Sequence, residues 1–256
     1  MTPALELAGV SVNIAGRLVV DGVSLTVAPG EVVGVIGANG CGKTTAIRAA
    51  LGLLRVQSGE ARLGGRPVAQ LSEADRARLA GYLPQERRIG WNLPAWRVAA
   101  LGAPHLPPVK ARATAMAALA EVEMAGLAER GVFDMSGGER ARVLFARLLV
   151  TGAPLLIADE PAAGLDPDAQ LLVADLLRAR ATRGVAVIVT LHDLTLAARS
   201  CDRLVVMAKG RVVASGTPRE ALTPEVLARA FALKGGLIDT ESGPVVAAHR
   251  SVVPTA

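Results

Sequence analysis

The feature that most constrains this chain is a glycine-rich loop at Gly37 to Thr44, GANGCGKT, which fits the pattern G-x-x-x-x-G-K-[ST]. The loop follows an apolar run at Glu31 to Ile36 with strand composition, and it precedes a helical pattern at Lys43 to Leu53. A chance glycine-rich turn is the alternative, but the strand, loop and helix order is the context that the pattern requires. The sequence therefore predicts a phosphate-binding loop.

The chemistry of the loop predicts a nucleoside triphosphate bound with magnesium. Glycines let backbone N–H groups turn inward around phosphate oxygens, and the helix adds its positive N-terminal end. Lys43 supplies a point charge for the β- and γ-phosphates, and the hydroxyl of Thr44 can complete the shell of a magnesium ion. The expected nucleotide-binding residues here are Gly37, Ala38, Asn39, Gly40, Cys41, Gly42, Lys43, Thr44 and Thr45.

A second strand end carries two carboxylates. The apolar run Leu155 to Ala158 leads directly into Asp159 and Glu160. We expect Asp159 to hold the magnesium ion through water, and Glu160 to orient or deprotonate a water that attacks the γ-phosphorus. An ordinary solvated acidic turn is the alternative, and the phosphate loop weighs against it.

One histidine stands at a comparable strand end. His192 follows the apolar run Val185 to Thr190, and the carboxyl ends of parallel strands line the ligand crevice of such sheets. A lone histidine is more often structural, so position alone leaves open whether His192 senses the γ-phosphate.

The remaining pattern predicts an α/β fold. Strand runs, including Arg203 to Met207, alternate with helical patterns at Pro167 to Arg180 and Leu194 to Ser200, which is typical of a parallel sheet. Before this core, short strands are expected at Leu5 to Ile14, 18–20 and 23–27, with Asp21-Gly22 as a break; they predict an antiparallel layer. From about Glu86 to Gly152 the strand signal disappears and an amphipathic helix is expected at 109–127.

Composition limits the functional class. The 256 residues are 51% hydrophobic and 20% charged, enough for a sizeable core, and the net charge of +5 is spread along the chain, so nucleic acid is not an expected partner. The only cysteines, Cys41 and Cys201, predict no disulfide framework and a reducing compartment. Cys41 is either a reactive thiolate or a passive small residue. No leader or membrane-length apolar run is visible, so we expect any membrane role to be performed from outside the bilayer.

The stretch Met135 to Arg140, MSGGER, resembles the signature of ABC transporter ATPases, usually LSGGQ, and the resemblance extends over nearly the whole chain. These residues stand at the start of a predicted helix, where a hydroxyl and backbone N–H groups can bind an anion. Ser136 and Glu139 also have the spacing of a capping box, and both interpretations can hold. The family resemblance implies that a second copy binds head to tail and that this stretch covers the other copy's ATP. The residues concerned are Ser136, Gly137, Gly138 and Glu139.

The same resemblance implies further roles. Gln85 looks like the Q-loop glutamine that ligates magnesium, His192 like the switch histidine, and Gly164 to Asp166 like the D-loop at the dimer interface. Ile14 stands where the family usually has an aromatic residue that stacks on adenine, so we expect apolar contact only and weaker base discrimination.

The implied architecture is a P-loop NTPase core of the ABC ATPase type with a parallel sheet, an antiparallel β layer and an inserted helical subdomain. The expected divisions are a nucleotide-binding core at 1–86 and 153–240, a helical subdomain at 87–152 and a C-terminal tail at 241–256.

Three segments are similar to the ATPases of importers for iron–siderophore complexes, haem and cobalamin: 82–86, 98–105 and 216–231. This similarity implies transmembrane permease subunits as partners, an indirect link to a substrate-binding protein, and a peripheral place on the cytoplasmic face of the inner membrane. The alternatives are a soluble ABC ATPase outside transport or a subunit for another cargo, such as a metal ion. A nucleotide-binding regulator without turnover is disfavoured by the presence of Glu160.

Overall fold

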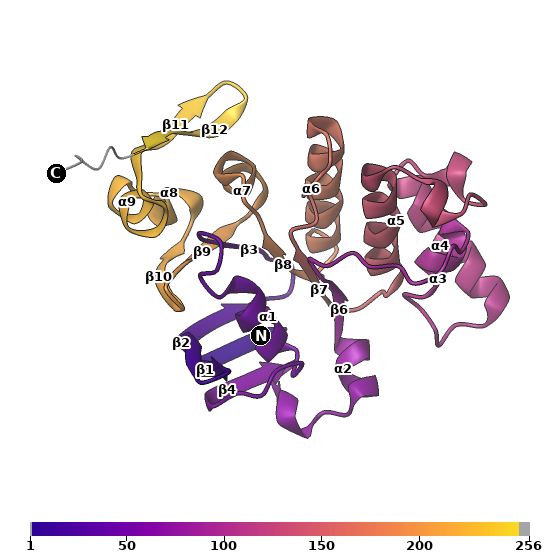
Figure 1. Ribbon diagram of the computed structural model, residues 1–256, viewed down its shortest axis with the longest axis horizontal. Coiled ribbons are helices and arrows are strands. Elements are labelled where there is room, and N and C mark those ends of the chain that lie inside the picture. Colours follow the sequence, from indigo (N-terminus) through magenta and orange to yellow (C-terminus); the bar gives the residue numbers. More distant parts are fainter. Residues whose placement is uncertain (1, 251–256) are drawn as a thin grey trace.

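The computed structural model describes residues 2–250, and its centre is a six-stranded sheet in the order β10-β9-β3-β8-β7-β6 (Figure 1). Neighbouring strands from β9 to β6 run parallel, and β10 is antiparallel to β9. Every residue of β3, β7 and β8 is buried, as the apolar runs predict for strands covered on both faces. The strands are β3 (Val32–Ile36), β6 (Ala80–Leu83), β7 (Leu155–Asp159), β8 (Ala186–Thr190), β9 (Arg203–Ala208) and β10 (Arg211–Gly216).

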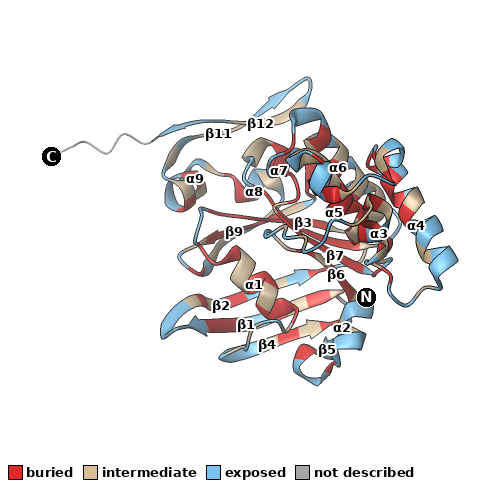
Figure 2. Ribbon diagram, turned by 45° about the vertical axis from the view of Figure 1, so that its right-hand side comes forward, coloured by how far each residue is buried: buried red, intermediate tan, exposed pale blue. Residues whose placement is uncertain are grey.

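A four-stranded antiparallel sheet lies beside this core in the order β2-β1-β4-β5. Its strands are β1 (Leu5–Ile14), β2 (Arg17–Val27), β4 (Ser58–Leu63) and β5 (Arg66–Pro67). The helix α1 (Lys43–Ala50), which follows the phosphate loop, packs its apolar face into the core between the two sheets. The predicted parallel sheet and antiparallel layer are both confirmed, and Figure 2 shows the buried residues concentrated along the central strands.

One predicted strand break is wrong. The structure has a single strand β2 across Asp21-Gly22, because one extra residue of β2 forms a bulge: the pairing steps from Val10 with Val23 to Val12 with Val20. Gly22 takes φ of 62°, and its N–H donates to Ser11 Oγ at 2.9 Å. A bulge kinks a strand without ending it, so its turn-like residues resemble a loop in the sequence.

The middle of the chain forms a group of helices at one end of the molecule (Figure 1), with α3 (Ala95–Ala100) and α4 (Pro108–Glu121) packed against α5 (Gly137–Val150). The helix expected at 109–127 ends at Glu121, because Glu123 adopts a left-handed φ of 58°; a short 3-10 turn, η2 (Ala125–Leu127), follows. Within residues 2–250, no helix has the length and apolar character needed to span a bilayer.

The other elements complete the framework. The helix α1 ends at Ala50 rather than at the predicted Leu53, and Gly52 follows with φ of 68°. Much of the expected tail is the second strand of a terminal hairpin that contacts α7 and α9. These elements are η1 (Val68–Gln70), α2 (Glu73–Leu79), η3 (Val132–Asp134), α6 (Pro167–Ala181), α7 (Leu194–Ser200), α8 (Pro218–Ala221), α9 (Pro224–Phe231), β11 (Leu233–Thr240) and β12 (Gly243–Arg250).

Candidate nucleotide site

The phosphate loop connects β3 to α1, as the sequence predicts. Gly42 precedes the helix with φ of 109°, a conformation that L side chains rarely adopt. A Cβ at Gly42 would also lie 2.9 Å from the carbonyl oxygen of Val19, so only glycine fits here. The loop and the first turn of α1 therefore depend on glycine at this position, and the helix N-terminus faces the loop.

Lys43 is held inside the loop. Lys43 is only 6% exposed. Its Nζ donates to the carbonyl oxygens of Gly37 at 2.8 Å and Ala38 at 3.4 Å. These two carbonyls satisfy a buried ammonium group that would otherwise be costly. The loop thus keeps a positive charge at the place where phosphate oxygens are expected.

The acid pair lies at the end of β7, next to the end of β8. Asp159 is fully buried, and its Oδ1 accepts a hydrogen bond from Thr190 Oγ1 at 2.6 Å. The same hydroxyl oxygen accepts the backbone N–H of Glu160 at 2.7 Å. Sequence reasoning did not assign a role to Thr190, although a hydroxyl that ends a buried apolar strand was a usable signal.

Glu160 makes contact with two other predicted site residues. Its carboxylate lies 2.6 Å from His192 Nε2 through Oε1, and it accepts a hydrogen bond from Gln85 Nε2 at 2.9 Å through Oε2. The side chain is only 11% exposed, whereas that of His192 is 46% exposed. Three residues from separate segments of the sequence therefore meet around one carboxylate.

These residues surround a cavity of about 510 Å³, which we call the phosphate-loop cavity. Val19 lines this cavity although the sequence did not predict it. Ile14, which is 43% exposed at the end of β1, does not line the cavity. The expected apolar contact between Ile14 and a base therefore stays a prediction. The lining residues are Val19, Asn39, Gly40, Gly42, Lys43, Thr44, Thr45, Gln85, Glu160 and His192.

Other predicted loop residues lie behind this surface. Gly37 and Ala38 contribute the carbonyls that hold Lys43. Cys41 is 5% exposed and packs in the apolar core between the sheets, which favours the passive interpretation of this thiol over the reactive one.

The corner at residues 136–139 belongs to another part of the molecule. Ser136 caps α5: its Oγ accepts the N–H of Glu139 at 3.2 Å, and Glu139 Oε2 accepts the N–H of Ser136 at 2.7 Å. The hydrogen bond from the Ser136 backbone holds the pKa of Glu139 below its usual value. The capping box is therefore present. Gly137 lines a second cavity of about 420 Å³ together with Arg87, Arg140, Ala141, Ala163 and Gly164.

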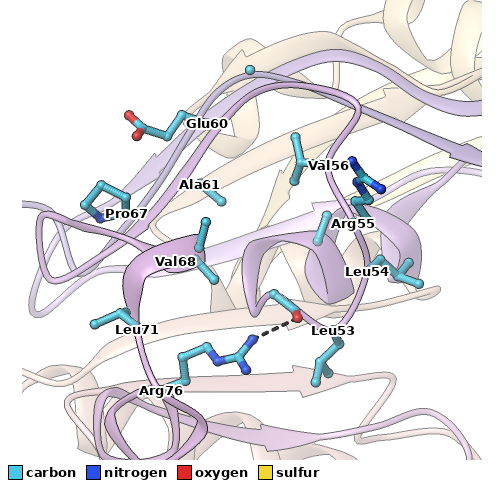
Figure 3. Close-up of a pocket in the computed structure, with 14 residues that line it drawn as sticks. Leu53, Leu54, Arg55, Val56, Glu60, Ala61, Pro67, Val68, Leu71 and Arg76 are labelled. Atoms are coloured by element: carbon cyan, nitrogen blue, oxygen red, sulfur yellow. Dashed lines mark hydrogen bonds between the residues drawn. The ribbon is translucent and has the colours of Figure 1, made fainter.

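A third cavity, of about 640 Å³, lies between the end of α1, β4 and α2 (Figure 3). Arg76 extends from α2 toward it and donates to the carbonyl oxygen of Gly52 at 2.8 Å. None of the predicted site residues lines this cavity. Volume alone therefore does not identify the site, and the phosphate-loop cavity is the one with convergent polar groups.

The donor set near Asp159 fits a magnesium ion. The second carboxylate oxygen, Oδ2, is buried with no hydrogen-bond partner, which is unusual for a charged group unless a cation or its water takes the place. Across residues 2–250, no three His, Cys, Asp or Glu side chains form a metal-binding group. Magnesium usually binds one or two protein oxygens and fills its shell with water and phosphate oxygens, so a single free carboxylate oxygen is a suitable protein contribution.

Comparisons with known proteins identify the family of the chain. Residues 20–163 match the ABC transporter family. The hemin import ATP-binding protein HmuV of Myxococcus xanthus is 39% identical over 252 residues, which cover 94% of this chain and 94% of that protein. The cobalamin import ATP-binding protein BtuD of Halobacterium salinarum is 39% identical over 232 residues, which cover 89% of this chain and 58% of that protein.

Solved structures give the same result. An ATP-binding subunit of an ABC transporter superposes with a TM-score of 0.77 at 28% identity, covering 84% of this chain and 90% of that one. CbiO1 of Clostridium perfringens, part of the ABC transporter complex cbiONQ, has a TM-score of 0.77 at 26% identity and covers 90% and 94%. The chain belongs to the ABC transporter family. Its activity is that of an ATPase, and its fold is the ABC ATPase fold expected from the sequence.

Proposed function

We propose that this chain binds Mg-ATP in the phosphate-loop cavity and hydrolyses it to drive an ABC importer. The observation that carries the proposal is the convergence of Lys43, Gln85, Glu160 and His192, from four separate segments, on one cavity. Catalysis of phosphoryl transfer consists mainly of positioning and charge stabilisation, and these four side chains supply both.

The chain's own residues divide the work of hydrolysis. Lys43 exchanges its carbonyl partners for the β- and γ-phosphates, and the N–H groups of the loop cradle the phosphate oxygens. Glu160 accepts a proton from the attacking water, or orients it, for in-line attack on the γ-phosphorus. His192 donates a hydrogen bond to the γ-phosphate.

Thr44, Gln85 and, through water, Asp159 would hold a magnesium ion, which would supply positive charge to offset that of the phosphates. Gln85 donates to Glu160 in this structure, so it would have to release this contact to act as a magnesium ligand. The hydrogen bond from Thr190 keeps Oδ1 of Asp159 satisfied and leaves Oδ2 available.

A second copy of the chain completes the site. The corner formed by Ser136, Gly137 and Gly138 presents a helix N-terminus and a hydroxyl, and it covers the γ-phosphate bound by the other copy in a head-to-tail dimer. This explains why these residues lie apart from the phosphate-loop cavity within one chain.

The cargo is haem, cobalamin or an iron–siderophore complex. Relatives named as hemin and cobalamin import ATP-binding proteins support haem and cobalamin, and the siderophore alternative rests on sequence similarity alone. The partners are permease subunits in the inner membrane, with the chain on their cytoplasmic face and a substrate-binding protein beyond them.

The proposal is tested by purifying the chain from its native membrane and measuring ATP hydrolysis. We expect a polytopic permease to co-purify, and ATPase activity to rise when the cognate substrate-binding protein is loaded with haem or cobalamin. Recovery with ribosomes or DNA, without a membrane protein, would support a non-transport ABC ATPase instead. Stimulation by a bare metal ion would change the cargo and leave the ATPase assignment intact.

A further inference from the structure

Arg87, two residues after Gln85, reaches into the turn that follows Glu160. Its guanidinium donates to three backbone carbonyls: Nη2 to those of Glu160 and Pro161, the latter at 2.9 Å, and Nη1 to that of Ala163 at 2.8 Å. No carboxylate takes part in these contacts. The planar fork of an arginine can hold several acceptors in fixed directions, which a lysine ammonium cannot do.

The carbonyls that Arg87 holds belong to a turn with an unusual backbone. Glu160 has a left-handed φ of 53°, a conformation that costs free energy for a residue with a side chain and persists only where its surroundings enforce it. The turn has one hydrogen bond of its own across it, from the Ala163 N–H to the Glu160 carbonyl at 3.2 Å. Arg87 adds three further bonds to the same short segment.

Arg87 also lies between the Gln85 segment, the turn after Glu160 and the start of α5. The segment that carries it also carries Gln85, which contacts the Glu160 side chain. Arg87 itself lines the 420 Å³ cavity beside Gly137 at the start of α5 and Gly164. Burial lowers the pKa of its guanidinium, and the Glu160 carboxylate opposes this shift. Arginine remains protonated under such conditions, so the hydrogen bonds persist at neutral pH.

We infer that Arg87 is a positioning residue for hydrolysis: it fixes the backbone of the Glu160 to Ala163 turn, and thereby the direction of the Glu160 carboxylate toward the attacking water. Arg87 touches neither nucleotide nor water in this scheme and acts through Glu160. The inference rests on the proposed function, because it takes Glu160 as the residue that handles the water. Movement of the segment that carries Gln85 would be transmitted to the turn through the same three bonds.

The neighbouring arginine provides a matched control. The side chain of Arg88 is 91% exposed and lies 3.7 Å from Glu86 in a surface ion pair, so Arg88→Ala removes the same charge one residue away without touching the turn. We expect Arg87→Ala to lower kcat for ATP by about 10- to 100-fold, as for a misplaced catalytic group, with KM and the Kd for ATP nearly unchanged. Arg88→Ala should match the wild type, and Arg87→Lys should recover only part of the loss.

A double-mutant cycle with Glu160→Gln distinguishes a positioning role of Arg87 from a general effect on folding. If Arg87 acts through Glu160, then Arg87→Ala should remove little further activity from the Glu160→Gln protein. Equal kcat for Arg87→Ala and wild type, or an undiminished loss in the Glu160→Gln background, overturns the inference. If Arg87→Ala does not fold, as judged by thermal denaturation, Arg87→Lys carries the same cycle. A wild-type chain without ATPase activity would instead contradict the proposed function.

Discussion

Glu160 shows how far residue types alone could predict this site. Its position after an apolar strand and an aspartate indicated a role in the chemistry, and the carboxylate indeed faces the phosphate-loop cavity. Its left-handed backbone and its contacts with Gln85 and His192 were not predictable, because they depend on segments that are distant in sequence. The residue type at the end of a strand can be read from the local sequence, whereas the contacts of its side chain depend on the tertiary fold.

The first prediction concerns this carboxylate. Glu160→Gln removes the proton acceptor but keeps the size of the side chain, so ATP should still bind while hydrolysis falls by about 10²- to 10⁴-fold. Steady-state phosphate release and equilibrium ATP binding measure the two effects separately. Hydrolysis at the wild-type rate would show that Glu160 is not the base.

The second prediction concerns Thr190, the residue that sequence reasoning missed. Thr190→Val removes one hydroxyl and leaves the buried Asp159 Oδ1 and the part-buried Glu160 N–H without a partner. The free energy of unfolding should fall by about 1–3 kcal/mol, measured by urea denaturation. Thr114→Val makes the same chemical change on the exposed surface of α4 and should stay within about 0.5 kcal/mol of wild type. Equal effects of the two substitutions would contradict this account of Thr190.

At the scale of elements, long periodic segments were predicted well. The strands from Leu5 to Ile14 and from Arg203, and the helix from Leu194 to Ser200, occur where their apolar patterns indicate. The errors lie where one residue changes the backbone without changing the pattern. A bulge at Gly22 keeps β2 continuous although Asp21-Gly22 looks like a turn in the sequence, and a left-handed Glu123 ends α4 early although glutamate there gives no sign of a helix end.

The third prediction separates the two roles of Ser136 at the start of α5. Ser136→Ala removes a helix cap and should lower the free energy of unfolding by about 1 kcal/mol. Ser72 caps α2 in the same way, accepting the N–H of Asp75 at 3.1 Å, so Ser72→Ala is the matched control. If Ser136 also contacts the partner's nucleotide, only Ser136→Ala should lower ATPase activity at a temperature where both proteins are folded. Equal activity of the two variants would leave Ser136 with the capping role alone.

At the scale of the whole molecule, the site exists because the parallel sheet brings four strand ends together. β3 delivers the phosphate loop, β7 the acid pair, and β8 leads to His192, while Gln85 follows the edge strand β6. The order of these strands could not be deduced from their sequences, because each is a similar apolar run. The motifs after the strands, in contrast, were distinctive enough to indicate the class of site before the topology was known.

The fourth prediction concerns the second copy. The corner at Ser136 lies apart from the phosphate-loop cavity within one chain, and in the proposed arrangement a second chain in head-to-tail contact closes the site. The Glu160→Gln protein should therefore elute as a dimer with Mg-ATP and as a monomer with ADP in size-exclusion chromatography with light scattering. A monomer under both conditions would contradict the two-chain site.

The central claim is that the nucleotide binds at the phosphate loop rather than in the larger cavity beside α2. Calorimetric titration with Mg-ATP tests it most directly, using Lys43→Ala for the phosphate-loop cavity and Arg76→Ala for the cavity beside α2. The account predicts that Lys43→Ala abolishes detectable binding and that Arg76→Ala binds ATP with wild-type affinity. Retained binding by a folded Lys43→Ala protein, with loss in Arg76→Ala, would contradict it.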